Sequence, residues 1–164
     1  MRKRMRFDEH ISLPAAEVYR GLLNLTNRCR WVPNFVGMET DAPGVAKRGT
    51  RFRQIQRFFG RDHVEDIEVL DAFQDRLVRF WVFTHKGPKH LRARVVQYRL
   101  HEDQEGCRVI LTVEAVGLSR AQWLLAHVQL PGLRKRLTEE FAAFRQFQEN
   151  PESESVNVAS LLAS

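Results

Sequence analysis

The sequence contains little cysteine. Among its 164 residues only Cys29 and Cys107 occur, far apart and outside any CxxC spacing. A disulfide framework or a zinc site needs several closely spaced ligands, so we expect neither. The scarcity of cysteine fits a reducing compartment.

Long apolar runs are also absent. No stretch approaches the ~18 apolar residues needed to span a bilayer. The basic residues 1–10 are followed by a stretch, 11–22, that Pro14 and charged residues interrupt, so it lacks the apolar core of a signal peptide. We therefore predict a cytoplasmic protein with no stable membrane insertion.

The common metal and cofactor motifs are missing as well. The six histidines show neither HxH nor HxxxH spacing, which argues against a metal site. Residues 44–49 do not match the GxxxxGK[ST] phosphate loop, and no serine stands in a GxSxG setting. We expect no metal and no cofactor.

Positive charge is in excess, with 26 Lys and Arg against 20 Asp and Glu. Such an excess invites a nucleic-acid or anionic-membrane interpretation. However, the densest basic stretch, 47–61, is followed at once by an acidic one, 62–71. We interpret the charges as a solvated surface and expect no nucleic-acid partner.

The remaining composition is that of one globular domain, with 43% hydrophobic and 28% charged residues. Residues 5–13 alternate apolar and polar, as in a half-buried strand, and Pro14 suits a helix start. A second short helical piece covers 24–30, and about six antiparallel strands separated by turns follow within 34–117.

After residue 117 the apolar spacing becomes helical, and Pro131 is expected to kink or break the helix. We assign the outer, solvated face of this helix to Arg134, Lys135, Glu139, Glu140 and Arg145. The prediction is an α+β fold in which a long C-terminal helix lies across a curved antiparallel sheet. Residues 1–149 form the domain, and 150–164 form a disordered tail.

The first hairpin indicates which side chains face the helix. With its turn at Phe59-Gly60, one face pairs opposite charges: Arg57 with Asp62, Arg53 with Asp66, and Arg51 with Glu68. A register shift of one residue would lose all three pairs, and we therefore expect this charged face to be exposed to solvent. The inner face then pairs Phe52 with Ile67, Gln54 with Glu65, and Gln56 with His63.

A second hairpin pairs Leu100 with Val109, Tyr98 with Leu111, and Val96 with Val113, all inward, with Arg94 on the same face. The strand between the two hairpins directs Phe80 and Val82 inward. Trp81 and Phe83 point outward as an exposed apolar patch, a candidate homodimer surface.

Three motifs carry a resemblance to a known superfamily. Residues 11–19, ISLPAAEVY, are similar to I-x-A-P-x-E-x-V-W/Y; residues 31–35, WVPNF, are similar to W-x-P; and residues 49–52, GTRF, are similar to G-T-R-W. In this order, over residues 5–148, the chain resembles the helix-grip START-like superfamily, also called SRPBCC or polyketide cyclase/dehydrase-like. Leu13, where a small residue is usual, and the break expected at Pro131 are departures.

The resemblance implies a seven-stranded antiparallel sheet wrapped around the terminal helix, with two short helices after the first strand. It also implies a hollow that binds lipids, polyketides or other apolar molecules. The predicted ligand-binding residues are Phe52, Gln54, Ile67, Phe80, Val82, Arg94, Tyr98, Leu111, Trp123 and His127. Among these, Arg94 could hold a carboxylate or enolate oxygen.

Three kinds of function stay open at this point. The first is binding, transport or sensing of a small hydrophobic molecule. The second is a cyclase or aromatase, with His63 or Glu65 as general acid or base and Arg94 beside them. The third is an interaction protein, like the quinone-binding or ribosome-associated branches of the superfamily, that acts through its basic surface or through Trp81 and Phe83.

Overall fold

A computed structural model of the chain describes residues 3–86, 92–116 and 118–152, with side chains described except at 3, 120 and 122–130. Its elements are β1 (Lys3–Ile11), α1 (Ala15–Leu23), the 3-10 turn η1 (Leu25–Asn27), α2 (Arg28–Trp31), β2 (Phe35–Thr40), β3 (Arg51–Phe58), β4 (Arg61–Phe73), β5 (Leu77–Thr84), β6 (Ala93–Asp103), β7 (Gly106–Ala115) and α3 (Arg120–Glu149).

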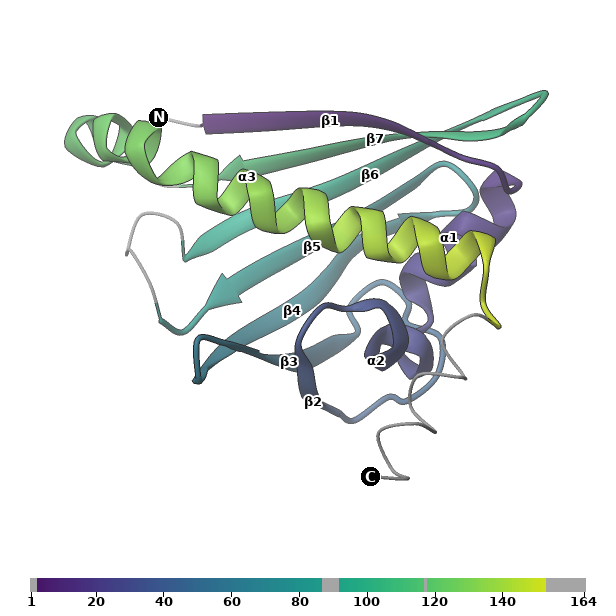
Figure 1. Ribbon diagram of the computed structural model, residues 1–164, viewed down its shortest axis with the longest axis horizontal. Helices are drawn as coiled ribbons and strands as arrows, with labels where there is room; N and C mark the ends of the chain where they lie inside the picture. Colours follow the sequence, from purple (N-terminus) through teal and green to yellow (C-terminus); the bar gives the residue numbers. More distant parts are fainter. Residues whose placement is uncertain (1–2, 87–91, 117, 153–164) are drawn as a thin grey trace.

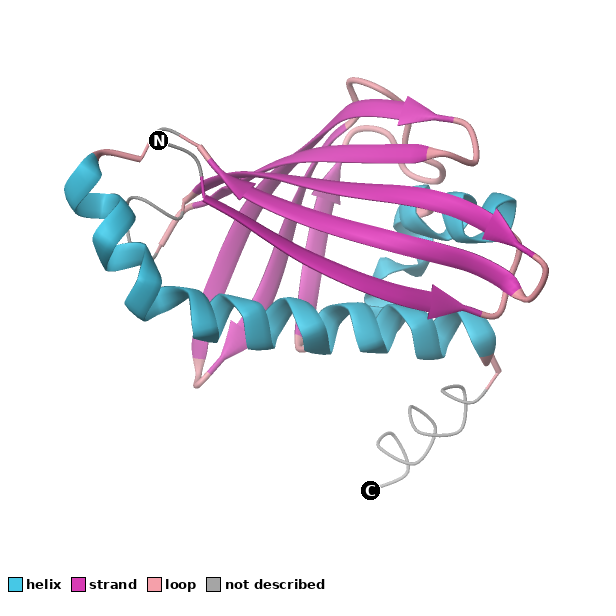
Figure 2. Cartoon of the chain, turned by 90° about the horizontal axis from the view of Figure 1, so that it is seen from above, coloured by secondary structure: helices cyan, strands magenta, loops and turns pink. Residues whose placement is uncertain are grey.

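The strands form one antiparallel sheet in the order β1-β7-β6-β5-β4-β3-β2. The long helix α3 crosses one face of this sheet, and α1 and α2 lie near the end of the sheet where α3 finishes (Figure 1). From above, the sheet curves, with α3 along one side (Figure 2). The predicted helix-grip architecture is therefore confirmed.

Helix α1 is amphipathic, and its buried residues follow helical spacing. Ala15, Val18, Leu22 and Leu23 are buried. Pro14 precedes the helix, and its carbonyl accepts hydrogen bonds from the N–H groups of Glu17 and Val18. The proline thus starts the helix without having to donate a hydrogen bond.

The β3–β4 hairpin has the predicted register. Arg57 faces Asp62, Arg53 faces Asp66, Arg51 faces Glu68, and Gln54 faces Glu65 on the opposite face. The turn residues Phe59 and Gly60 have φ angles of 50° and 71°, the left-handed geometry of a two-residue hairpin turn. The β6–β7 register is also as predicted, with Leu100 opposite Val109 and Tyr98 opposite Leu111.

The sequence predicted a kink or a break at Pro131, and the break was wrong, because helix α3 continues through this residue. An internal proline removes one hydrogen bond and bends a helix, which the remaining bonds can tolerate. Figure 2 shows the first turns of α3 running at an angle to the rest. The straight part packs on the sheet through buried Leu137, Phe141, Phe144 and Phe147.

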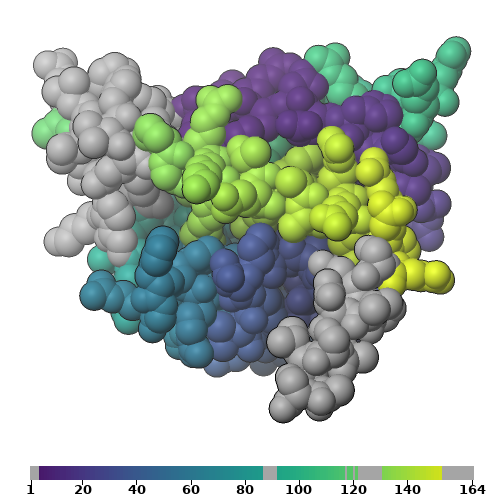
Figure 3. Space-filling view, in the orientation of Figure 1, coloured from purple at the N-terminus to yellow at the C-terminus, as the bar shows by residue number. Residues whose placement is uncertain are grey.

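In the space-filling view, α3 lies between β1 and the segment that contains α2 and β2 (Figure 3). The ring centroids of Trp31 on α2 and Phe144 on α3 are 4.9 Å apart, so the two helices are in direct contact. Within the described ranges, no helix has the length and apolar character needed to cross a bilayer.

Candidate functional site

A small cavity lies between the inner face of the sheet and α3. Its volume is about 30 Å³, and it is lined by Leu22, Arg28, Trp31, Glu65, Ile67, Phe80, Val82, Arg94, Val96, Tyr98, Leu137 and Glu140. A cavity of this volume has room for about one water molecule. Pockets that enclose drug-sized ligands typically have about 300–1,000 Å³. A ligand of that size would enter only if side chains rotate or α3 shifts outward.

Five of the predicted ligand-binding residues line this cavity, namely Ile67, Phe80, Val82, Arg94 and Tyr98. Of the others, Phe52 and Gln54 are buried beside the cavity, and Leu111 belongs to the hydrophobic core. The side chains of Trp123 and His127 lie outside the described residues. The role of all of these residues in binding stays a prediction.

One polar end of the cavity is organised around Glu65 of β4, which is 4% exposed. Its Oε1 atom lies 2.5 Å from Nη2 of Arg94 and 3.0 Å from Nη2 of Arg136. The Thr84 hydroxyl donates to the same oxygen at 3.3 Å and accepts from Nη1 of Arg94 at 2.8 Å. A single carboxylate thus connects β4, β5, β6 and α3.

The two arginines determine the charge state of Glu65. Burial alone would raise the pKa of this carboxyl, but the charges of Arg94 and Arg136 outweigh it and hold the pKa well below its usual range. Glu65 is therefore ionised at neutral pH. A carboxylate in that state has no proton to give and is a weak base, which disfavours the hypothesis that Glu65 is a general acid.

His63 lies beside this carboxylate and also contacts Arg136. Its Nε2 is 3.1 Å from Oε1 of Glu65 and 2.7 Å from Nη1 of Arg136. Because a guanidinium can only donate, Nε2 accepts from Arg136 when it carries no proton, and the ring proton is then on Nδ1. Arg136 also donates to Gln56 at 2.7 Å and lies 5.1 Å from the ring centroid of Phe58.

A second buried arginine, Arg28 of α2, stands apart from the Glu65 cluster. Its side chain is covered by aromatic rings, with the guanidinium carbon 4.8 Å from the centroid of Trp31 and 5.1 Å from that of Phe52. Its Nε donates to Oε1 of Gln54 at 2.9 Å. Burial lowers the pKa of Arg28, and the charge of Glu140 opposes this effect.

Three residues of this region were not predicted from the sequence. Glu140 was predicted on the solvated face of α3 but lines the cavity, because it lies one turn after the buried Leu137. Arg136 was not singled out, and nothing in the local pattern distinguishes it from its charged neighbours. Arg28 carried one weak signal, its position three residues before Trp31 in a short helix.

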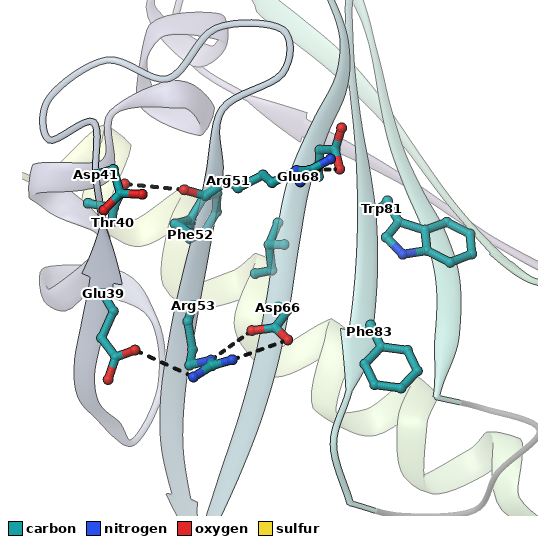
Figure 4. A pocket seen from close by; sticks show the side chains of 11 residues that line it. Glu39, Thr40, Asp41, Arg51, Phe52, Arg53, Asp66, Glu68, Trp81 and Phe83 are labelled. Carbon is teal, nitrogen blue, oxygen red and sulfur yellow. Dashed lines mark hydrogen bonds and ion pairs between the residues drawn. The ribbon is translucent and has the colours of Figure 1, made fainter.

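A shallow groove of about 550 Å³ lies on the outer face, across β2 to β5. Figure 4 shows its charged residues pairing with one another, among them Arg53 with Asp66 at 2.7 Å. Trp81 and Phe83 occupy its β5 side, and Phe83 is exposed. A homodimer through Trp81 and Phe83 stays a prediction. In the described part of the chain, no group of three His, Cys, Asp or Glu side chains could hold a metal ion.

Comparison with known proteins gives one family match. The profile described as "Polyketide cyclase / dehydrase and lipid transport" matches residues 3–146. No curated protein sequence matches the chain.

Similar solved structures span nearly the whole chain. Protein CV1439 from Chromobacterium violaceum is 14% identical, with a TM-score of 0.67 over 90% of this chain and 98% of its own. TTHA0849 from Thermus thermophilus is 19% identical, with a TM-score of 0.63 over 92% and 100%. Major latex-like protein 151 from Panax ginseng is 10% identical, with a TM-score of 0.64 over 90% and 97%. At these identities the likeness establishes the fold alone.

Proposed function

Because this chain belongs to the polyketide cyclase/dehydrase and lipid transport family, in the helix-grip START-like superfamily, we propose that it binds a small, mostly apolar molecule between the sheet and α3. The ligand would be of lipid, polyketide or aromatic type, and the protein would transport or sense it. The expected site is the cavity beneath α3.

The lining of the cavity carries this proposal. Apolar side chains from α1, the sheet and α3 surround it, including Leu22, Phe80, Val96 and Leu137. A few polar side chains lie among them, including the buried residues Arg28, Glu65 and Arg94. An apolar enclosure with a small number of placed polar groups is the usual composition of a small-molecule site.

The size of the cavity sets a condition on binding. A ligand larger than a water molecule must displace α3 or the side chains that it holds in place. Arg136 links α3 to the β3–β4 hairpin by hydrogen bonds to Gln56, His63 and Glu65. We therefore expect ligand uptake to be coupled to loosening of this link, on the microsecond-to-millisecond timescale of collective motions.

Fluorescence titration with the neutral apolar dye N-phenylnaphthylamine tests the proposal. We expect saturable binding with a stoichiometry of one, and weaker binding in Val96→Phe, which fills the cavity. The matched control is Val95→Phe, because Val95 is the neighbouring residue on β6 and lines a groove on the opposite face of the sheet.

Equal loss of dye binding in both variants would place the dye elsewhere and contradict the proposed site. Native mass spectrometry of protein purified from cells gives a second readout, because a retained apolar ligand adds its mass to the chain. Absence of dye binding together with a mass equal to the bare chain would refute the proposed function.

A further inference from the structure

The cavity holds hydrogen-bond donors that have no acceptor among the described residues. Beyond the proposed binding of an apolar molecule, and resting on it, we propose that Arg28 binds a single oxyanion on the ligand. The ligand is then an amphipathic monoanion, such as an apolar carboxylate, rather than a neutral lipid. This role is distinct from the one that the sequence indicated for Arg94.

The setting of Arg28 differs from that of the other two arginines of the interior. Arg94 and Arg136 share Glu65 within 3.0 Å. Arg28 is 6% exposed, yet among the described residues no carboxylate oxygen lies within 4.0 Å of it. Its side chain makes one hydrogen bond to a described residue, from Nε to Gln54. A buried cation without a direct counterion is costly, and such a position favours an anionic partner.

Neighbouring donors support the same assignment. Trp31 lines the cavity beside Arg28, and its buried Nε1 has no hydrogen-bond partner among the described residues. The buried Nε of Arg94, another lining residue, also has none. Burial and the charge of Glu140 raise the pKa of Tyr98, so its hydroxyl keeps its proton and can donate as well. The cavity thus offers N–H and O–H groups that only an acceptor can satisfy.

The balance of charge points the same way. Arg28, Arg94, Glu65 and Glu140 line the cavity, and Arg136, which does not line it, shares Glu65 with Arg94, so the cluster as a whole holds three positive charges and two negative ones. One bound monoanion would balance this excess, whereas a dianion would exceed it. Glu140 is the acidic group with the largest influence on Arg28, and it would repel a bound anion.

The rest of the lining defines the body of the ligand. Four of the other lining residues have entirely apolar side chains, namely Leu22, Phe80, Val96 and Leu137. The aromatic rings of Trp31 and Phe52 lie within 5.1 Å of the Arg28 guanidinium carbon and limit its motion. A molecule with one charged end and an otherwise apolar body satisfies both surroundings.

Two dyes that share one scaffold separate this inference from the proposed function. N-phenylnaphthylamine is neutral, and anilinonaphthalenesulfonate adds one anionic sulfonate to it. We expect the wild-type protein to bind the anionic dye about 10-fold more tightly, the size expected for a hydrogen bond to a charged group. We expect Arg28→Gln to remove that preference, so that the ratio of the two dye affinities falls by about 10-fold.

The matched control is Arg30→Gln. Arg30 lies two residues away, is exposed, and its loss changes the net charge of the chain equally. It should leave the preference for the anionic dye intact. A second variant, Glu140→Gln, keeps Arg28 and removes the neighbouring negative charge, so it should tighten the anionic dye relative to the neutral one.

Each outcome decides between the two proposals. If the neutral dye binds and the wild-type protein shows no preference for the anionic one, the inference fails while the proposed function stands. The inference also fails if Arg30→Gln lowers the anionic affinity as much as Arg28→Gln does, or if Glu140→Gln weakens it. If neither dye binds, the inference fails, and the proposed function fails with it when the purified protein also has the mass of the bare chain. If Arg28→Gln does not fold, the Glu140→Gln result decides.

Discussion

Arg136 of α3 and Glu65 of β4 meet beside the cavity, with Nη2 of the arginine 3.0 Å from Oε1 of the carboxylate. Arg94 of β6 reaches the same oxygen at 2.5 Å. One buried charge therefore holds the helix to two strands of the sheet. Because the contacts converge on one atom, the loss of that atom affects all three elements together.

Replacing Glu65 should destabilise the protein strongly. Glu65→Gln leaves Arg94 and Arg136 without their shared counterion, and breaking a buried ion pair in this way costs about 3–5 kcal/mol of unfolding free energy. Urea unfolding followed by circular dichroism measures the loss. Glu68→Gln is the control, because Glu68 pairs with the exposed Arg51 and such pairs contribute about 0–1 kcal/mol. Equal losses in the two variants would contradict this account of the cluster.

The stability of the fold should fall in acid. The folded-state pKa of Glu65 lies well below the unfolded value, so this contribution is complete above about pH 4.3 and declines as the pH falls toward the folded pKa. Exposed aspartates with lowered pKa values, Asp8 and Asp62 among them, act in the same direction.

The difference between wild type and Glu65→Gln isolates the buried group. We expect the free energies of unfolding of the two proteins to converge as the pH is lowered from about 5 to 2. Urea titrations at several pH values measure this. A constant difference over that range would mean that Glu65 is not the source of the pH dependence.

Arg136→Met should loosen α3. The variant removes hydrogen bonds to His63, Gln56 and Glu65, at a cost of about 1.5–3 kcal/mol for the bonds to a charged group. If this link limits ligand uptake, the association rate of N-phenylnaphthylamine should rise. Stopped-flow fluorescence measures that rate. Lys135→Met is the control, because Lys135 is exposed and reaches Glu139 at 3.9 Å. An unchanged association rate would show that uptake does not depend on Arg136.

Gly106 should tolerate no side chain. Its φ of 147° is one that L-residues rarely adopt, and an added Cβ would collide with the backbone of Ile11 and Ser12. Strained backbone alone costs about 1–3 kcal/mol, and the collision at the junction of β1 and β7 adds to it. We expect a clear loss of melting temperature in Gly106→Ala.

Gly60→Ala is the comparison for that variant. Gly60 also has a positive φ, 71°, but a Cβ added there would meet no atom within 4 Å, so only the backbone cost applies. A Gly106→Ala protein as stable as Gly60→Ala would contradict the close approach described for β1 and β7.

Much of the fold followed from local pattern. Alternation placed Phe52, Gln54 and Gln56 on one face of β3, and the opposite charges of Arg53 and Asp66 set the register with β4. The face of each side chain and the register both depend on residues within one hairpin. Because side chains alternate between the two faces of a strand, only one register satisfies both. For Pro131 the local rule left a kink or a break open, and the structure has a continuous helix whose first turns run at an angle to the rest.

The polar interior was predictable only in part. The inward direction of Glu65 and Arg94 follows from the register of their strands, and the structure places both on the cavity. That Arg136 also pairs with Glu65 does not follow, because Arg136 comes from α3, seventy-one positions from Glu65 along the chain. The rotation of a helix about its axis depends on the surface that it packs against, and no local pattern encodes it.

By itself, the sequence determined the elements, the pairing of neighbouring strands and the face that each strand side chain occupies, because these depend on periodicity and turn chemistry between near neighbours. The tertiary structure alone decided that Arg28 and Glu140 face one cavity, and that Arg94 and Arg136 share one oxygen. Those relationships arise where α2, the sheet and α3 meet, and they depend on distances that only the packed chain defines.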